Sequence, residues 1–136
     1  MTIDDWLQVG KERGADAEAI VEQRSLSIGS VYVAGYAIEC SLKAYLRSIG
    51  KAFPTAGAGG HNLTALWRAS GFRKRDIGGD DGCKTFFFDT WSTALRYATT
   101  IEPSGMSAEE LVEGAKRIAG WINMQVRRTS LRRRRR

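Results

Sequence analysis

The sequence predicts an all-α fold, a bundle of four to five helices in which most neighbours are antiparallel. Three observations support this fold class. Apolar residues recur every three or four positions in several segments, glycine and proline separate those segments, and no two segments pair as a β-hairpin would. With 136 residues, 43% hydrophobic and 26% charged, the chain has the size of one domain with a single core.

The first two predicted helices precede Gly50. Residues 3–23 set apolar side chains among charged ones, and we expect this helix to be interrupted or bent near Gly10 and Gly14, because glycine lowers helix propensity. Residues 30–49 give the clearest pattern, since their apolar positions fall on about one third of a helical wheel. That face is predicted to be core.

A loop and a short helix follow. The glycines of residues 56–60 disfavour helix, as does Gly50, which has the position of a helix C-cap. Asn62 has the chemistry of an N-cap for a short helix that ends at Gly71. Residues 76–82, rich in glycine and aspartate, are predicted to form a solvent loop.

Two further helices complete the prediction. The spacing of the aromatic residues in 85–100 favours a helix, and a strand over 85–88 is the alternative because β-propensity is high there. Ser107 and Glu110 have the form of a capping box, so the last helix should begin here. Its apolar stripe runs to Val126, where the arginines begin.

The positive charge is concentrated at the C-terminus. Subtracting the seven arginines of the last ten residues, which include no acid, from the net charge of +6 leaves −1 for residues 1–126. We therefore expect a helical bundle over 1–126 and an arginine-rich tail over 127–136. The arginines are Arg127, Arg128, Arg132, Arg133, Arg134, Arg135 and Arg136.

Several classes of protein are disfavoured. Cys40 and Cys83 are too few for a disulfide framework, which indicates a reducing cytoplasm. The first residues have no signal-peptide pattern and no segment reaches about 18 apolar residues, so no membrane association is expected. One histidine and two distant cysteines make no metal site, and no cofactor is predicted.

Three separated segments, in this order, resemble the HEPN domain superfamily. They are residues 34–46 with Glu39 and Lys43, residues 60–63 with His61, and residues 91–97 with Trp91, Arg96 and Tyr97. The second helix of HEPN domains typically carries a Glu-x-x-x-Lys-Ala pattern, the third begins near a His-Asp/Asn-Leu turn, and the fourth carries Trp followed by Arg-Tyr. The resemblance spans about residues 4–126.

This resemblance implies a helical bundle, often a homodimer, associated with RNA cleavage, toxin–antitoxin pairs and anti-phage defence. A minimal nucleotidyltransferase is a frequent partner. Catalytic members carry an arginine and a histidine with four to six residues between them, near the start of the last helix. Here the sole histidine is His61. The positions where the arginine would stand before it hold Pro54, Thr55 and Ala56, so the usual ribonuclease motif is missing.

Candidate catalytic residues lie elsewhere. Tyr32, Tyr36, Glu39 and Lys43 follow one another at spacings of four, three and four, so they share a strip beside the core face. In the structural interpretation Glu39 and Lys43 form a half-buried ion pair and His61 is a turn or cap residue. In the functional one Glu39, His61 and Arg96 bind phosphate or transfer a proton, supported by Tyr36, Lys43 and Tyr97.

Three functions remain in view. The leading hypothesis is an accessory or RNA-associating module of a bacterial toxin–antitoxin or defence system, with the C-terminal arginines binding phosphates; a merely solvated tail is the alternative. The second is an atypical, metal-independent ribonuclease that uses Glu39, His61 and Arg96. The third is an adaptor that docks a partner protein through exposed Trp6 and Trp121.

Overall fold

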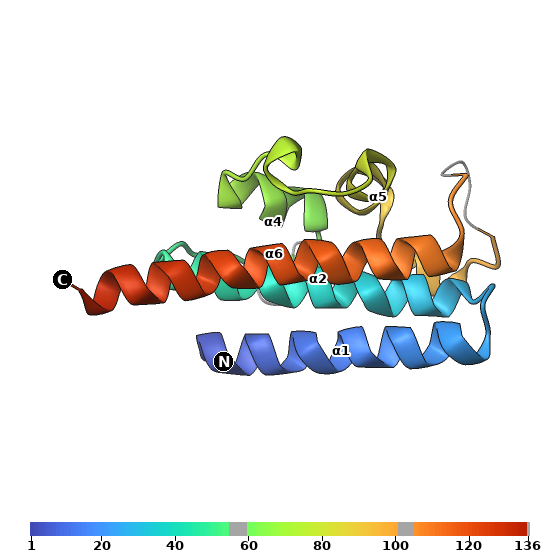
Figure 1. The fold of residues 1–136 in the computed structure, drawn as a ribbon, viewed down its shortest axis with the longest axis horizontal. Coiled ribbons are helices and arrows are strands. Elements are labelled where there is room, and N and C mark those ends of the chain that lie inside the picture. Colours follow the sequence, from blue (N-terminus) through green and yellow to red (C-terminus); the bar gives the residue numbers. More distant parts are fainter. Residues whose placement is uncertain (55–59, 101–104, 136) are drawn as a thin grey trace.

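The computed structural model describes residues 1–54, 60–100 and 105–135, and all regular structure within these ranges is helical, which confirms the helical bundle (Figure 1). The long helices α1 (Ile3–Gln23), α2 (Ile28–Ser48) and α6 (Ala108–Arg134) lie side by side. Shorter elements pack against α2 and α6 on the side away from α1 (Figure 1): α4 (Leu63–Ser70), η1 (Lys74–Asp76), α5 (Asp81–Thr85), η2 (Phe86–Thr90) and η3 (Thr93–Tyr97).

The long helices do not all alternate in direction. α1 runs opposite to α2 and α6, as predicted, whereas α2 and α6 run the same way and end at the same side of the bundle (Figure 1). The guanidinium of Arg133 accordingly lies 3.9 Å from the position that a β-carbon on Gly50 would occupy. The expectation of antiparallel neighbours is wrong for this pair, because the long connection between α2 and α6 brings the chain back to the end where α2 begins.

The predicted helix ends are confirmed where capping residues specify them. Ser107 Oγ accepts a hydrogen bond from Glu110 N at 3.1 Å, and Glu110 Oε1 accepts one from Ser107 N at 3.2 Å. Asn62 Oδ1 accepts a hydrogen bond from Ala65 N at 3.0 Å and starts α4. α4 ends at Gly71, whose φ of 77° lies in the left-handed region.

The glycines of α1 serve packing and do not interrupt the helix. α1 is continuous from Ile3 to Gln23, so the predicted break near Gly10 and Gly14 is wrong. A β-carbon on Gly10 would lie 3.0 Å from Cys40 Cβ, and one on Gly14 would lie 3.8 Å from Ala37 Cβ. Because glycine has no side chain, α1 can approach α2 closely, and this contact outweighs the low helix propensity of glycine.

The segment predicted as one helix over 85–100 is divided. α5 begins earlier, at Asp81 inside the predicted loop, and passes into the π-helical turn η2; the alternative strand does not form. Trp91 then leaves the helix with φ −57° and ψ 135°, and η3 follows. The side chains of Phe86, Phe87 and Phe88 are all buried, so tertiary packing overrides the helical period here.

The last helix is longer than predicted. The apolar stripe of α6 ends at Val126, but the helix continues through Arg134, so most of the segment expected as a separate tail is helical. The loop predicted over 56–60 falls, apart from Gly60, on residues outside the described ranges. Within those ranges no helix combines the length and the apolar character that a membrane crossing needs.

Candidate functional site

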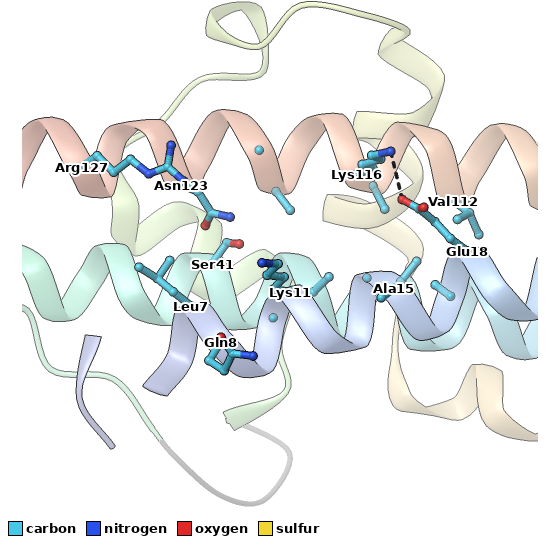
Figure 2. A pocket seen from close by; sticks show the side chains of 18 of the residues that line it. Leu7, Gln8, Lys11, Ala15, Glu18, Ser41, Val112, Lys116, Asn123 and Arg127 are labelled. Carbon is cyan, nitrogen blue, oxygen red and sulfur yellow. Dashed lines mark ion pairs between the residues drawn. The ribbon is translucent and has the colours of Figure 1, made fainter. Parts of the chain in front are cut away.

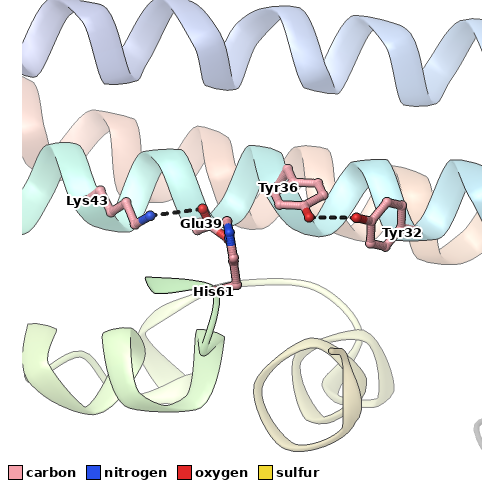
Figure 3. A network of polar contacts seen from close by, with 5 residues as sticks. All are labelled: Tyr32, Tyr36, Glu39, Lys43 and His61. Atoms are coloured by element: carbon pink, nitrogen blue, oxygen red, sulfur yellow. Dashed lines mark hydrogen bonds and ion pairs between the residues drawn. The ribbon is translucent and has the colours of Figure 1, made fainter. Parts of the chain in front are cut away.

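Glu39, Lys43 and His61 form one polar cluster on α2 (Figure 3). The ammonium of Lys43 donates to Glu39 Oε2 at 3.0 Å, and the Nδ1–H of His61 donates to Glu39 Oε1 at 2.9 Å. Both carboxylate oxygens are therefore used by side chains. Of the three predicted catalytic residues, the structure brings Glu39 and His61 together.

The ion pair is more deeply buried than the sequence indicated. Glu39 is 3% exposed and Lys43 1% exposed, whereas a half-buried pair was expected. The Lys43 ammonium also lies 4.8 Å from the ring centroid of Trp6. Because a buried charge is costly without partners, the carboxylate, the ammonium and the indole face depend on one another.

His61 connects this interior pair to solvent. It lies immediately before Asn62, the cap of α4, and α4 is held against α2 by the buried Leu63 and Leu66. The His61 side chain is 37% exposed while its carboxylate partner is 4% exposed. An imidazole with one nitrogen bound to a buried carboxylate and a second nitrogen available is an arrangement suited to proton transfer.

Aromatic rings extend the cluster along α2. The hydroxyls of Tyr32 and Tyr36 are hydrogen-bonded at 2.6 Å, and the Tyr36 ring meets His61 edge-to-face with centroids 5.6 Å apart. The Trp91 ring closes the group at 5.6 Å from the Tyr36 ring. Burial, followed by the hydrogen bond with Tyr32, raises the pKa of Tyr36, so its hydroxyl stays protonated and can donate.

Arg96, the third predicted catalytic residue, lies with the tyrosines and does not contact Glu39 or His61. Its guanidinium is 4.8 Å from the ring centroid of Tyr97, and the charge interaction with Tyr97, together with hydrogen bonding to Tyr32, raises the pKa of Arg96. Tyr97 is 79% exposed. Polar and aromatic side chains thus follow one another from His61 through the tyrosines to Arg96. The guanidinium of Arg96 lies at the end that faces solvent.

A second group of candidate residues occupies the end of α6. The described arginines are exposed, and no carboxylate within the described ranges pairs with any of them; they are Arg127, Arg128, Arg132, Arg133, Arg134 and Arg135. Because α2 ends beside α6, Arg47 and Lys51 add two cations there and line a cavity of ≈ 370 Å³. We call these eight residues the basic end.

The tryptophans expected to dock a partner are not free. Trp6 is 9% exposed and packs against Phe53 at 6.2 Å between ring centroids. Trp121 is half-buried and meets Phe72 edge-to-face at 4.8 Å. The prediction of exposed aromatic anchors is wrong, because both indoles cover core residues.

The cysteines are free and buried. Burial raises the pKa of Cys40 from 9.0 to about 11, and it does the same for Cys83. A raised thiol pKa leaves little thiolate near neutral pH, so neither is an activated nucleophile. Within the ranges that the structure describes, no three His, Cys, Asp or Glu side chains gather as metal ligands would.

Sequence reasoning missed Trp6 and Trp91 as walls of the polar cluster and Arg47 and Lys51 as part of the basic end. No sequence pattern links residues so far apart, since contact between helices decides their placement. Comparison of the chain with protein-family models, characterised proteins and solved structures finds no match.

Proposed function

We propose that this protein is an RNA-associating helical module that binds phosphate groups at the basic end. The observation that carries the proposal is that six exposed arginines, five on the last turns of α6 and Arg135 at its C-cap, have no carboxylate partner within the described ranges. Like charges on one helix repel each other, and bound phosphates remove that repulsion while releasing counterions.

The helical conformation favours binding along a nucleic-acid backbone. A helix holds its arginines at fixed positions, so less conformational entropy is lost on binding than from a flexible segment. Arg47 and Lys51 approach from α2 and widen the cationic surface. Guanidinium groups bind phosphate through paired hydrogen bonds without reading a base, so the proposed binding has little sequence preference.

Salt dependence tests this proposal. Affinity for a labelled single-stranded RNA is measured by fluorescence anisotropy at increasing salt concentrations. Replacing Arg132, Arg133, Arg134 and Arg135 by glutamine should weaken binding and reduce the slope of log affinity against log salt by about three, at roughly 0.7 for each phosphate contact. Lysine at the same four positions should retain most of the slope. Unchanged binding by the glutamine variant would refute the proposal.

The biological setting is supported by the resemblance to HEPN domains alone. On that basis the protein acts in the bacterial cytoplasm as an accessory component of a toxin–antitoxin or anti-phage defence system, as a homodimer or with a minimal nucleotidyltransferase. Sedimentation of the purified protein, alone and with a nucleotidyltransferase encoded beside its gene, tests both assemblies. A monomer that sediments independently of that protein would exclude them.

A second candidate function, a metal-independent ribonuclease, is favoured by the 2.9 Å hydrogen bond between His61 and Glu39. In this proposal His61 Nε2 takes the proton of a ribose 2′-hydroxyl while that oxygen attacks phosphorus. The bond from phosphorus to the 5′ oxygen breaks, and that oxygen takes a proton from water. Glu39 orients the imidazole, and Arg96 together with the Tyr36 hydroxyl holds the phosphate.

Incubation with end-labelled RNA in excess EDTA tests this alternative. Cleavage should leave cyclic phosphate ends, should disappear in His61→Ala and should weaken in Arg96→Gln. Arg68→Gln, which changes an exposed arginine on α4, should cleave like the parent protein. Cleavage that survives in His61→Ala comes from another site or a contaminant, and absence of cleavage by the parent protein would refute the ribonuclease.

A further inference from the structure

A groove of ≈ 780 Å³ runs along the face of the bundle between α1 and α6, with α2 as its floor (Figure 2). Its floor residues are small, among them Ala34 and Ala37 on α2 and Ala115 on α6. At one end the Lys116 ammonium and the Glu18 carboxylate form an ion pair at 3.2 Å that joins α6 to α1. The residues of the polar cluster, Glu39, Lys43 and His61, do not line this groove.

The dimensions of the groove favour a slender occupant. Its lining on α1 extends from Asp4 to Glu18, a rise of about 21 Å at roughly 1.5 Å per residue. A volume of ≈ 780 Å³ over that length gives a mean cross-section of about 37 Å². An α-helix with side chains is about 10 Å across and needs roughly twice that area. A single hydrocarbon chain can be enclosed along this length, whereas a helix of a partner would stand partly outside the groove.

Unsatisfied polar groups are gathered away from the ion-paired end. Ser41 is 2% exposed, faces the groove, and has no hydrogen-bond partner for its hydroxyl among the described residues. Asn123 Oδ1 is a buried oxygen that likewise has none. Lys11 and Arg127 bring two cations that pair with no carboxylate in the part of the chain that the structure describes, and Asp4 brings one exposed carboxylate.

The other half of the groove is apolar. Between Ser41 and the Lys116–Glu18 pair, the lining consists mainly of alanine and glycine, and Val112 lies beyond that pair (Figure 2). A ligand pocket typically has this composition, mostly apolar with a few polar groups that fix orientation. The hydroxyl of Ser41 is a donor that a carboxylate would satisfy, and Asn123 can offer its NH₂, although its buried Oδ1 is an acceptor that a carboxylate does not satisfy.

We infer that the groove between α1 and α6 binds a medium-chain fatty carboxylate. The carboxylate accepts hydrogen bonds from Ser41 and Asn123 with Lys11 and Arg127 beside it, and the hydrocarbon chain lies over the alanines toward Val112. This site is independent of RNA association, although Arg127 belongs to both surfaces.

Isothermal titration calorimetry with decanoate and octanoate tests the inference. Decanoate should bind the parent protein roughly 15-fold more tightly than octanoate, since each buried methylene contributes about fourfold. Decanol, which lacks the charge, should bind more weakly than decanoate. Ser41→Ala should lower decanoate affinity about tenfold and leave the unfolding temperature unchanged, because it removes a hydroxyl that the folded protein does not use.

Tryptophan substitutions on exposed positions of α1 provide the matched control. Ala15 lines the groove and Ala19 does not, and both are exposed. Ala15→Trp should abolish decanoate binding, while Ala19→Trp should bind like the parent protein. Absence of saturable binding, or equal binding by both variants, would overturn the inference. It is also overturned if sedimentation shows a dimer that Ala15→Trp dissociates, because the groove is then covered by a second copy.

Discussion

The indole of Trp91 occupies the space beside Gly35 on α2, where the β-carbon of any other residue would clash with Cε2 and Nε1 of the ring. The same ring stacks on Tyr32 with centroids 6.3 Å apart. This contact holds the chain in extended conformation between η2 and η3. It also places Arg96 beside the tyrosines that extend the polar cluster.

Gly35→Ala should therefore destabilise the protein by about 3 kcal/mol, because an added methyl group displaces a buried ring in a close-packed core. Chemical denaturation followed by circular dichroism measures this change. Gly120→Ala is the control: Gly120 lies in α6 with open space at its β-carbon position, so this change should stabilise by about 0.5–1 kcal/mol. Equal effects of the two substitutions would contradict the packing of Trp91 on Gly35.

The buried pair of Glu39 and Lys43 predicts a strongly coupled double-mutant cycle. Lys43→Met should cost about 3–5 kcal/mol of unfolding free energy, because it leaves the buried carboxylate without its cation. Adding Glu39→Leu should recover most of that loss, since both charges are then gone. Lys74→Met breaks an ion pair whose side chains are 37% and 53% exposed and should cost less than about 1 kcal/mol. Similar costs for the two lysine variants would show that Lys43 is solvated.

The raised thiol pKa values predict a loss of stability in alkaline solution. In the unfolded chain both cysteines ionise near 9.0, whereas in the folded protein burial raises each pKa to about 11. The folded state therefore binds more protons between these values, and the unfolding free energy should fall as pH rises from 9 to 11.

Urea titrations at several pH values measure that slope. Cys40→Ala combined with Cys83→Ala should flatten the slope between pH 9 and 10, whatever the change in stability at neutral pH. The raised pKa of Tyr36 acts in the same direction at higher pH and remains in this variant. An identical slope with and without the cysteines would contradict their burial.

The capping box of α6 predicts a measurable contribution to stability. Ser107→Ala removes the acceptor for Glu110 N and should cost about 1 kcal/mol, while Ser107→Asp should retain most of the stability because aspartate also caps. Thermal unfolding of the two variants provides the comparison. If alanine and aspartate give the same midpoint, the N-terminus of α6 is stabilised by other contacts.

Local patterns predicted the parts of the structure that local chemistry controls. The helical period of residues 30–49, the caps at Asn62 and Ser107, and the stop at Gly71 each depend on residues within one turn, and the structure has each of them. The proximity of Glu39 and Lys43 follows from the same rule, as residues four apart meet on one helix face.

Tertiary contacts decided the rest. By helix propensity alone, Gly10 and Gly14 predict a break, but their contact with α2 explains why glycine stands there. The apolar spacing of residues 85–100 predicts one helix, but the packing of Trp91 on Gly35 divides it. The meeting of His61 with Glu39, the parallel course of α2 and α6, and the groove that Ser41 faces all involve residues far apart in the chain. Helical periodicity specifies which face of each helix is buried, but only packing between helices determines which faces meet and which polar groups are left without a partner.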